Sequence, residues 1–102
     1  MENIVEDMEI RRQSVNYQAR MVVMELKGLL QSVYAGREIQ RQRVQTAAER
    51  GRELSVDREA WPGGDREVYE YLGVVDGLEK QIYQAMDFRK LKDEGFLRAV
   101  SF

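Results

Sequence analysis

The sequence predicts an all-α protein, built either as an elongated antiparallel helical hairpin or as a three-helix arrangement with coiled-coil-like packing. Two long stretches lack proline, because Pro62 is the chain's only one. In both stretches apolar residues recur at steps of three and four, the spacing of one helix face. Between them, WPGGD at 61–65 combines Pro-Gly and Gly-Gly, which mark a turn. We therefore expect residues 1–102 to form a single helical domain.

The first helix is predicted over residues 3–35. Asn3 and Glu6 form a capping-box-like start, and no proline follows in this segment. A heptad seam then runs through four repeats with one charged member, Arg12, which is either packed in the seam or exposed if the first turns are uncovered. The seam consists of Val5, Met8, Arg12, Val15, Ala19, Val22, Leu26, Leu29 and Val33.

The second half of this helix carries additional apolar surface. A helix that is apolar on two sides is usually packed against other helices on both sides. One short chain has few helices that could do so. This pattern predicts self-association or a helical partner. The additional residues are Met21, Val23, Met24, Leu30 and Tyr34.

Residues 37–54 are predicted to be helical, either continuing the first helix through Gly36 or forming a second helix after a left-handed cap at this glycine. The segment is rich in helix formers and has no turn dipeptide. Its packing is the least determined, because its apolar residues are sparse and partly small. They are Ile39, Val44, Ala47, Ala48 and Leu54.

A corner is expected over residues 55–65, with Trp61 packing over the helix ends and Asp65 capping the helix that follows. That last helix is predicted over 66–92, and a short apolar tail over 96–102. The corner lacks the Gly-Lys-Ser/Thr of a phosphate-binding loop and is followed by Asp-Arg-Glu, so we interpret it as structural.

The composition excludes several chemistries. The chain has no cysteine and no histidine, so disulfides, the usual zinc sites and Ser-His or Cys-His catalysis are absent. The acidic pairs Glu67/Glu70 and Asp76/Glu79 resemble those of all-helical magnesium-dependent nucleotide pyrophosphohydrolases. Glu67 and Asp76 are nine residues apart on one helix, so at about 100° per residue the pairs point to opposite sides. We therefore expect a solvated acidic surface, and no catalytic, metal or cofactor residue.

An arginine-rich stretch supports the alternative function, a nucleic-acid-binding regulator using the helix at 37–52. Its guanidinium groups could bind phosphates. Acidic residues lie among these arginines and lower the local positive charge. Three pairs have the spacing of ion pairs along one helix: Glu38–Arg41, Glu49–Arg52 and Arg50–Glu53. The candidate nucleic-acid contacts are Arg37, Arg41, Arg43, Arg50 and Arg52.

The Trp-x-Gly string at 61–63 is similar to the motif at the bend of a family of secreted helical hairpins of about a hundred residues. Residues 83–87 fit that family's Tyr-x-x-x-Asp export signal, and residues 34–38 loosely match it too. The resemblance implies an exported hairpin, a minor alternative. The late position of Trp61 gives a longer first arm than the family's nearly equal arms.

Rows of small residues occur on both long helices. Gly28, Ser32 and Gly36 are four apart, as are Gly73 and Gly77. A glycine inside a helix lowers helix stability by about 0.8–1 kcal/mol relative to alanine. The glycines in these rows therefore need a structural explanation. We expect close helix crossing there.

We predict a non-enzymatic interaction or assembly protein acting through helix packing, such as an adaptor, small chaperone, regulator or structural subunit of a larger particle. The expected partner is a second copy or a helical protein. The N-terminus lacks a secretory pattern and Glu25 and Lys27 interrupt the most apolar stretch, so we expect a cytoplasmic protein, or a component of a particle assembled there, and no membrane. The predicted interaction seam is Val15, Ala19, Val22, Leu26, Leu29, Val33, Val68, Leu72, Val75 and Ile82.

Overall fold

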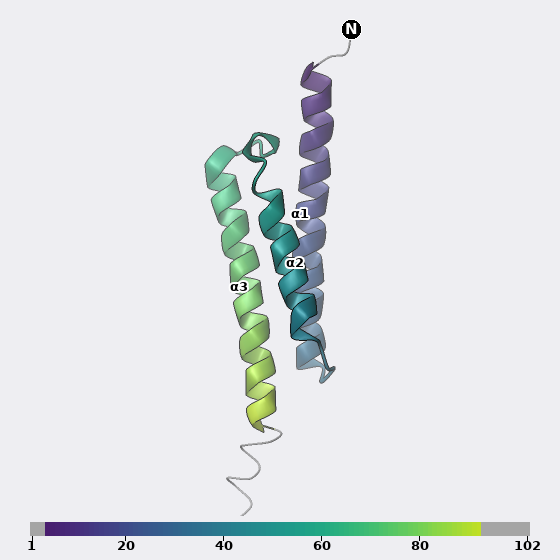
Figure 1. Cartoon of the computed structure of the whole chain (residues 1–102), viewed down its shortest axis with the longest axis vertical. Helices are drawn as coiled ribbons and strands as arrows, with labels where there is room; N and C mark the ends of the chain where they lie inside the picture. The colour runs from purple at the N-terminus through teal and green to yellow at the C-terminus, as the bar shows by residue number, and fades with distance from the viewer. Residues whose placement is uncertain (1–3, 93–102) are drawn as a thin grey trace, which may run out of the picture.

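The protein is an elongated bundle of three α-helices that pack against one another (Figure 1). The computed structural model describes residues 4–92, and that part of the chain contains no strand. The all-α class and the three-helix arrangement are thus confirmed, while Asn3 and the tail predicted at 96–102 lie outside the described residues. The elements are α1 (Ile4–Tyr34), α2 (Arg41–Leu54), the 3-10 turn η1 (Arg58–Ala60) and α3 (Gly64–Lys90).

Gly36 ends α1 and allows the chain to reverse its direction. Its φ is +88°, its N–H donates to the Val33 carbonyl at 3.1 Å, and the Arg37 N–H donates to the Ser32 carbonyl at 2.9 Å. These bonds are the Schellman motif that ends a helix. The second helix therefore begins at Arg41 rather than at 37, and it runs back along α1. α3 turns once more, so α1 and α3 run in the same direction (Figure 1).

The core lies where the heptad seam of α1 meets α2 and α3. From Ala19 to Val33 the seam is buried, and the apolar face of α3 closes on it. Small side chains let α2, the shortest helix, fit against both neighbours. The buried residues of this core are Val22, Leu26, Leu29, Val33, Val44, Ala47, Ala48, Val75 and Ile82.

All three helices lie close together at Gly51. A Cβ added there would lie 3.0 Å from the Tyr71 Oη, 3.0 Å from the Val22 Cγ1 and 3.2 Å from the Val75 Cγ2. Gly51 is therefore the position where the core needs a glycine.

The predicted explanation for the other small residues is wrong within the chain. A Cβ at Gly28, Gly73 or Gly77 would meet nothing within 4 Å, so these glycines line no helix crossing. All three are exposed. The three helices approach one another along different faces, which the spacing of the small residues does not reveal.

The corner between α2 and α3 is built around Trp61, which is buried with Ala19, Ala60 and Val68. The Trp61 indole Nε1 donates to the Leu54 carbonyl at 3.0 Å, which satisfies a carbonyl that the end of α2 leaves without a helical partner. The indole thereby fixes the end of one helix against the start of the next. This contact gives Trp61 a structural role.

The start of α3 differs from the predicted one. The N-cap residue is Gly63, whose N–H donates to the Glu67 carboxylate at 2.5 Å, and Gly64 follows with a φ of +69°. Asp65 lies inside the first turn, where its carboxylate binds Arg58 at 2.8 Å. Asp65 is therefore not the cap. The helix spans Gly64–Lys90 rather than 66–92. It begins two residues earlier than predicted because Gly63 and Gly64 adopt the backbone conformations that its first turn requires.

The first turns of α1 extend past the corner (Figure 1). Arg12 is exposed, so the interpretation in which it is packed in the seam is wrong for the single chain. The neighbouring Arg11 instead binds Asp57 through two of its guanidinium nitrogens. This hydrogen bonding lowers the pKa of Asp57 and raises that of Arg11. It ties the projecting helix to the segment before η1.

Candidate interaction surface

The predicted interaction seam lies inside the molecule. Val15 and Leu72 are partly buried against the Trp61 cluster, and the other members are buried in the core. The seam holds the three helices of one chain together. The buried seam is therefore not accessible to a partner of the folded chain. The buried members are Ala19, Val22, Leu26, Leu29, Val33, Val68, Val75 and Ile82.

A second apolar strip lies on the outward side of α1. Ile10, Tyr17, Met21 and Met24 are 61%, 66%, 46% and 64% exposed. With Ser14 and Gly28 they follow one another at steps of four and three, the spacing of a coiled-coil seam. We call the six residues the outer strip.

The position of the outer strip explains its exposure. At 3.6 residues per turn it lies about 140° around α1 from the buried seam, so α2 and α3 both pack on the other side of the helix. The sequence pattern pointed to Met21 and Met24 but missed Ile10 and Tyr17. Both residues are found when the same alternating spacing of three and four residues is traced along the side of α1 that faces away from the buried seam.

A shallow groove runs beside the outer strip between α1 and α2. Tyr17, Met21 and Met24 line it from α1, and Arg50 lines it from α2. The Arg50 Nη1 binds the Glu25 Oε2 at 3.3 Å across the groove. The outer strip is therefore flanked on the α2 side by an ion pair.

Another groove lies between α1 and α3. Val23 and Val74 form part of its apolar lining, while Arg20, Glu67 and Glu70 bring charge to it. Nearer the other end of the bundle, Tyr34 and Phe88 line a separate small groove between the same helices. Met24, a member of the outer strip, also lines the groove that contains Val23 and Val74, so the apolar surface of the strip continues toward α3 there.

The arginines of α2 mainly bind acids of the other helices. Arg41 binds Asp87 at 2.8 Å and lies 4.7 Å from the Tyr83 ring centroid, and Arg50 binds Glu25. The expected pairs along α2 itself are not the ones formed. The cross-helix partners are 46 and 25 residues away in sequence, a separation that a helical-wheel argument does not cover.

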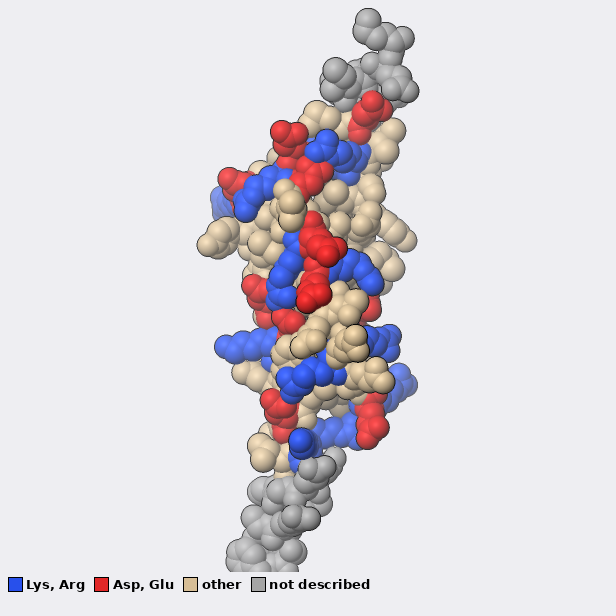
Figure 2. Space-filling view, viewed as in Figure 1, with Lys and Arg blue, Asp and Glu red and all other residues tan. Residues whose placement is uncertain are grey.

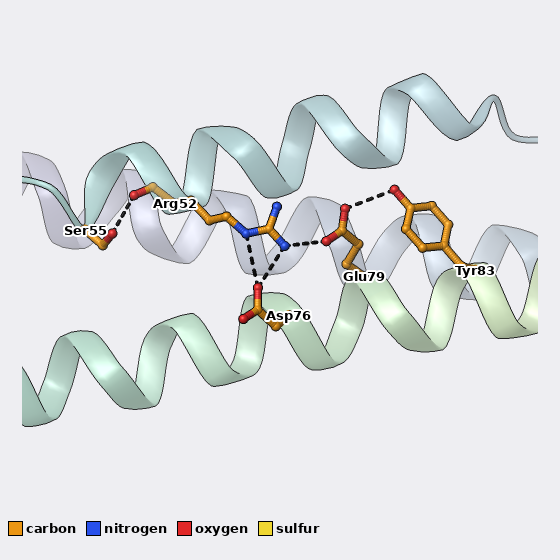
Figure 3. Close-up of polar contacts among 5 residues, drawn as sticks. All are labelled: Arg52, Ser55, Asp76, Glu79 and Tyr83. Atoms are coloured by element: carbon orange, nitrogen blue, oxygen red, sulfur yellow. Dashed lines mark hydrogen bonds and ion pairs between the residues drawn. The ribbon is translucent and has the colours of Figure 1, made fainter.

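Arg52 lies at the centre of a polar network that joins α2 to α3 (Figure 3). Its Nη2 binds the Asp76 Oδ1 at 2.8 Å and also binds Glu79, and these hydrogen bonds raise the Arg52 pKa. The Tyr83 hydroxyl donates to the other Glu79 oxygen at 3.0 Å. Asp76 is 61% exposed, as expected of a solvated acidic surface, whereas Glu79 is only 16% exposed. Both carboxylates bind Arg52 and so join α3 to α2.

Charge on the face seen in Figure 2 is correspondingly mixed. Lysine and arginine side chains alternate with acids along the bundle and do not gather into an area of one sign. Of the candidate nucleic-acid contacts, Arg37 and Arg43 are exposed, and neither forms an ion pair with the described residues. A phosphate backbone would thus have to displace carboxylates from Arg41, Arg50 and Arg52.

Among residues 4–92, no group of three or more acidic side chains is placed to hold a metal ion. No helix in this range is long and apolar enough to cross a membrane. Trp61 lies between α2 and α3, so the Trp-x-Gly string is not at the bend of a two-helix hairpin. No protein-family model, curated protein or solved structure matches this chain.

Proposed function

We propose that this chain is a non-enzymatic assembly protein that associates with a second copy of itself through the outer strip of α1. The observation that carries the proposal is the exposure of Ile10, Tyr17, Met21 and Met24 at heptad spacing. Removing apolar surface from water is favourable by about 25 cal/mol per Å², so a continuous strip of this kind favours burial against another helix.

The polar chemistry of the chain supports a packing role over nucleic-acid binding. Arg41, Arg50 and Arg52 each join α2 to another helix, so they contribute to the bundle's own structure. A nucleic-acid surface usually presents its basic side chains as one free stripe. Self-association requires no rearrangement of these ion pairs.

The experiment compares two double variants by sedimentation equilibrium. Leu26 and Leu29 are buried, so changing them would unfold the chain rather than test an interface. Tyr17→Glu/Met21→Glu instead alters exposed positions of the outer strip. Tyr69→Glu/Phe88→Glu, the matched control, places the same number of acids at exposed apolar positions of α3, away from the outer strip.

The wild-type chain should dimerise across roughly micromolar to hundred-micromolar concentrations. The outer-strip variant should be monomeric at all of them with unchanged helix content, and the control should dimerise like the wild type. A monomeric wild type, or a control that dissociates while the outer-strip variant does not, would overturn the proposal.

A further inference from the structure

We infer that two copies pair their α1 helices in parallel and in register, with Arg20 of each copy binding Glu25 of the other. The inference rests on the proposed function and adds the identity and orientation of the occupant. It follows from the charges that flank the outer strip on its two sides.

The two flanks differ in charge. In the heptad that places Met21 at a core position, the flank nearer α3 carries Gln13, Arg20, Lys27 and Tyr34, and holds no acid. The structure agrees with this placement, since Arg20 lines the groove shared with α3. The flank nearer α2 carries Arg11, Gln18, Glu25 and Ser32.

Glu25 is the acid available on the second flank. Its side chain is 32% exposed and faces α2, where one carboxylate oxygen binds Arg50. A carboxylate accepts more than one guanidinium hydrogen bond, so a second arginine can approach it. Arg11 on the same flank is already engaged by Asp57.

The relative direction of the two helices decides which flanks meet. An antiparallel pair places each flank against the same flank of the other copy, so Arg20 faces Lys27 or Arg20, depending on the register. A parallel pair places opposite flanks together and brings Arg20 next to Glu25 of the second copy, five residues further along. Like charges repel across such an interface, so the charges favour the parallel pair.

The same complementarity identifies the occupant as a second copy. One α1 carries both the basic flank and the acid that the basic flank needs. Tyr17, Met21 and Met24 then meet their own counterparts, and Gly28 leaves room where no side chain of its own chain contacts it. Two identical pairs of Arg20 with Glu25 form, as two-fold symmetry requires.

Charge reversal tests the orientation. Arg20→Glu and Glu25→Arg should each weaken the dimer roughly tenfold, since each replaces two attractive pairs with two repulsive ones. An equimolar mixture of the two variants should recover wild-type affinity as a heterodimer, because both of its pairs are attractive again. Circular dichroism checks that Glu25→Arg, which loses the contact with Arg50, keeps its helix content.

For an antiparallel dimer, the expected effect of Arg20→Glu on dimer affinity is the opposite. Arg20→Glu would then tighten association by facing Lys27, and the mixture would bind no better than the variants alone. Those results overturn the parallel pairing but leave the proposed function standing, provided that Tyr17→Glu/Met21→Glu still dissociates the dimer. Charge variants that dimerise like the wild type would also overturn the parallel pairing alone. A wild-type chain that stays monomeric, or a dimer that survives Tyr17→Glu/Met21→Glu, would overturn both proposals.

Cross-linking gives an independent readout, because the chain has no cysteine. Ser14→Cys should form a disulfide dimer on mild oxidation, since parallel pairing places the two introduced thiols opposite each other. In the antiparallel register that centres Met21 and Met24, they would be about 25 Å apart, far beyond disulfide reach. A mixture in which Ser14→Cys links only to Gln31→Cys would overturn the inference.

Discussion

The Tyr71 hydroxyl lies against Gly51, where a Cβ would come within 3.0 Å of its oxygen. The hydroxyl is buried and has no hydrogen-bond partner among the described residues. The Tyr71 ring also packs on Trp61, with centroids 4.9 Å apart. Tyr71 therefore contacts both Gly51, where the three helices lie close together, and the corner around Trp61.

Gly51→Ala should lower the free energy of unfolding by about 1–2 kcal/mol, because Val22 and Val75 are buried, stiff at χ1 and unable to move aside. Gly77→Ala is the matched control. It lies in a helix with nothing within 4 Å of its Cβ position and should raise the free energy by about 0.8–1 kcal/mol. Urea unfolding measures both. Equal effects would mean that the crossing is looser than the structure shows.

Tyr71→Phe should raise the free energy of unfolding by about 1 kcal/mol. The substitution removes a buried hydroxyl that makes no hydrogen bond and keeps the ring that packs on Trp61. Urea unfolding at neutral pH measures the change. A loss of stability would show that the hydroxyl has a partner, such as an ordered water.

Tyr71 should also make stability depend on pH in the alkaline range. Burial raises the Tyr71 pKa from 10.0 to about 12, so the unfolded chain releases this proton first. The unfolded state binds fewer protons between these values, and the free energy of unfolding should fall as pH rises through them.

Tyr71→Phe should show a shallower fall over the same range. Part of the fall should remain, because burial and the hydrogen bond to Glu79 also raise the Tyr83 pKa. Urea unfolding at a series of pH values gives the two slopes. Identical slopes would remove Tyr71 as the source.

Gly64→Ala should lower the free energy of unfolding by about 1–2 kcal/mol, because the residue has a φ of +69° that alanine adopts only with strain. Thermal unfolding followed by circular dichroism measures the loss. Sedimentation should show unchanged self-association of the folded protein, since the corner is no part of the outer strip. A variant as stable as the parent but impaired in association would instead make the corner a binding site.

Arg12→Leu should change the free energy of unfolding by no more than about 0.5 kcal/mol, as is usual for an exposed position. It should also leave the oligomeric state unchanged, because Arg12 is no member of the outer strip. A clear rise in melting temperature would show that the first turns of α1 are packed in solution.

The sequence by itself determined the helical class, the corner around Trp61 and the approximate helix bounds. These features depend on local energies: backbone hydrogen bonds reach four residues, and proline and glycine act where they stand. The spacing of Val22, Leu26 and Leu29 also identified the buried face of α1, since a helix presents residues three and four apart on one side.

Only the tertiary structure decided how those helices combine. Gly36 was compatible with a continuous helix or a cap, and its Schellman geometry made α1 and α3 run in the same direction. The need for glycine at Gly51 and the pairing of Arg52 with Asp76 follow from contacts between helices distant in sequence. The outer strip stayed exposed for the same reason: which apolar face of a helix remains uncovered depends on where the other helices lie, and spacing along one helix does not contain that information.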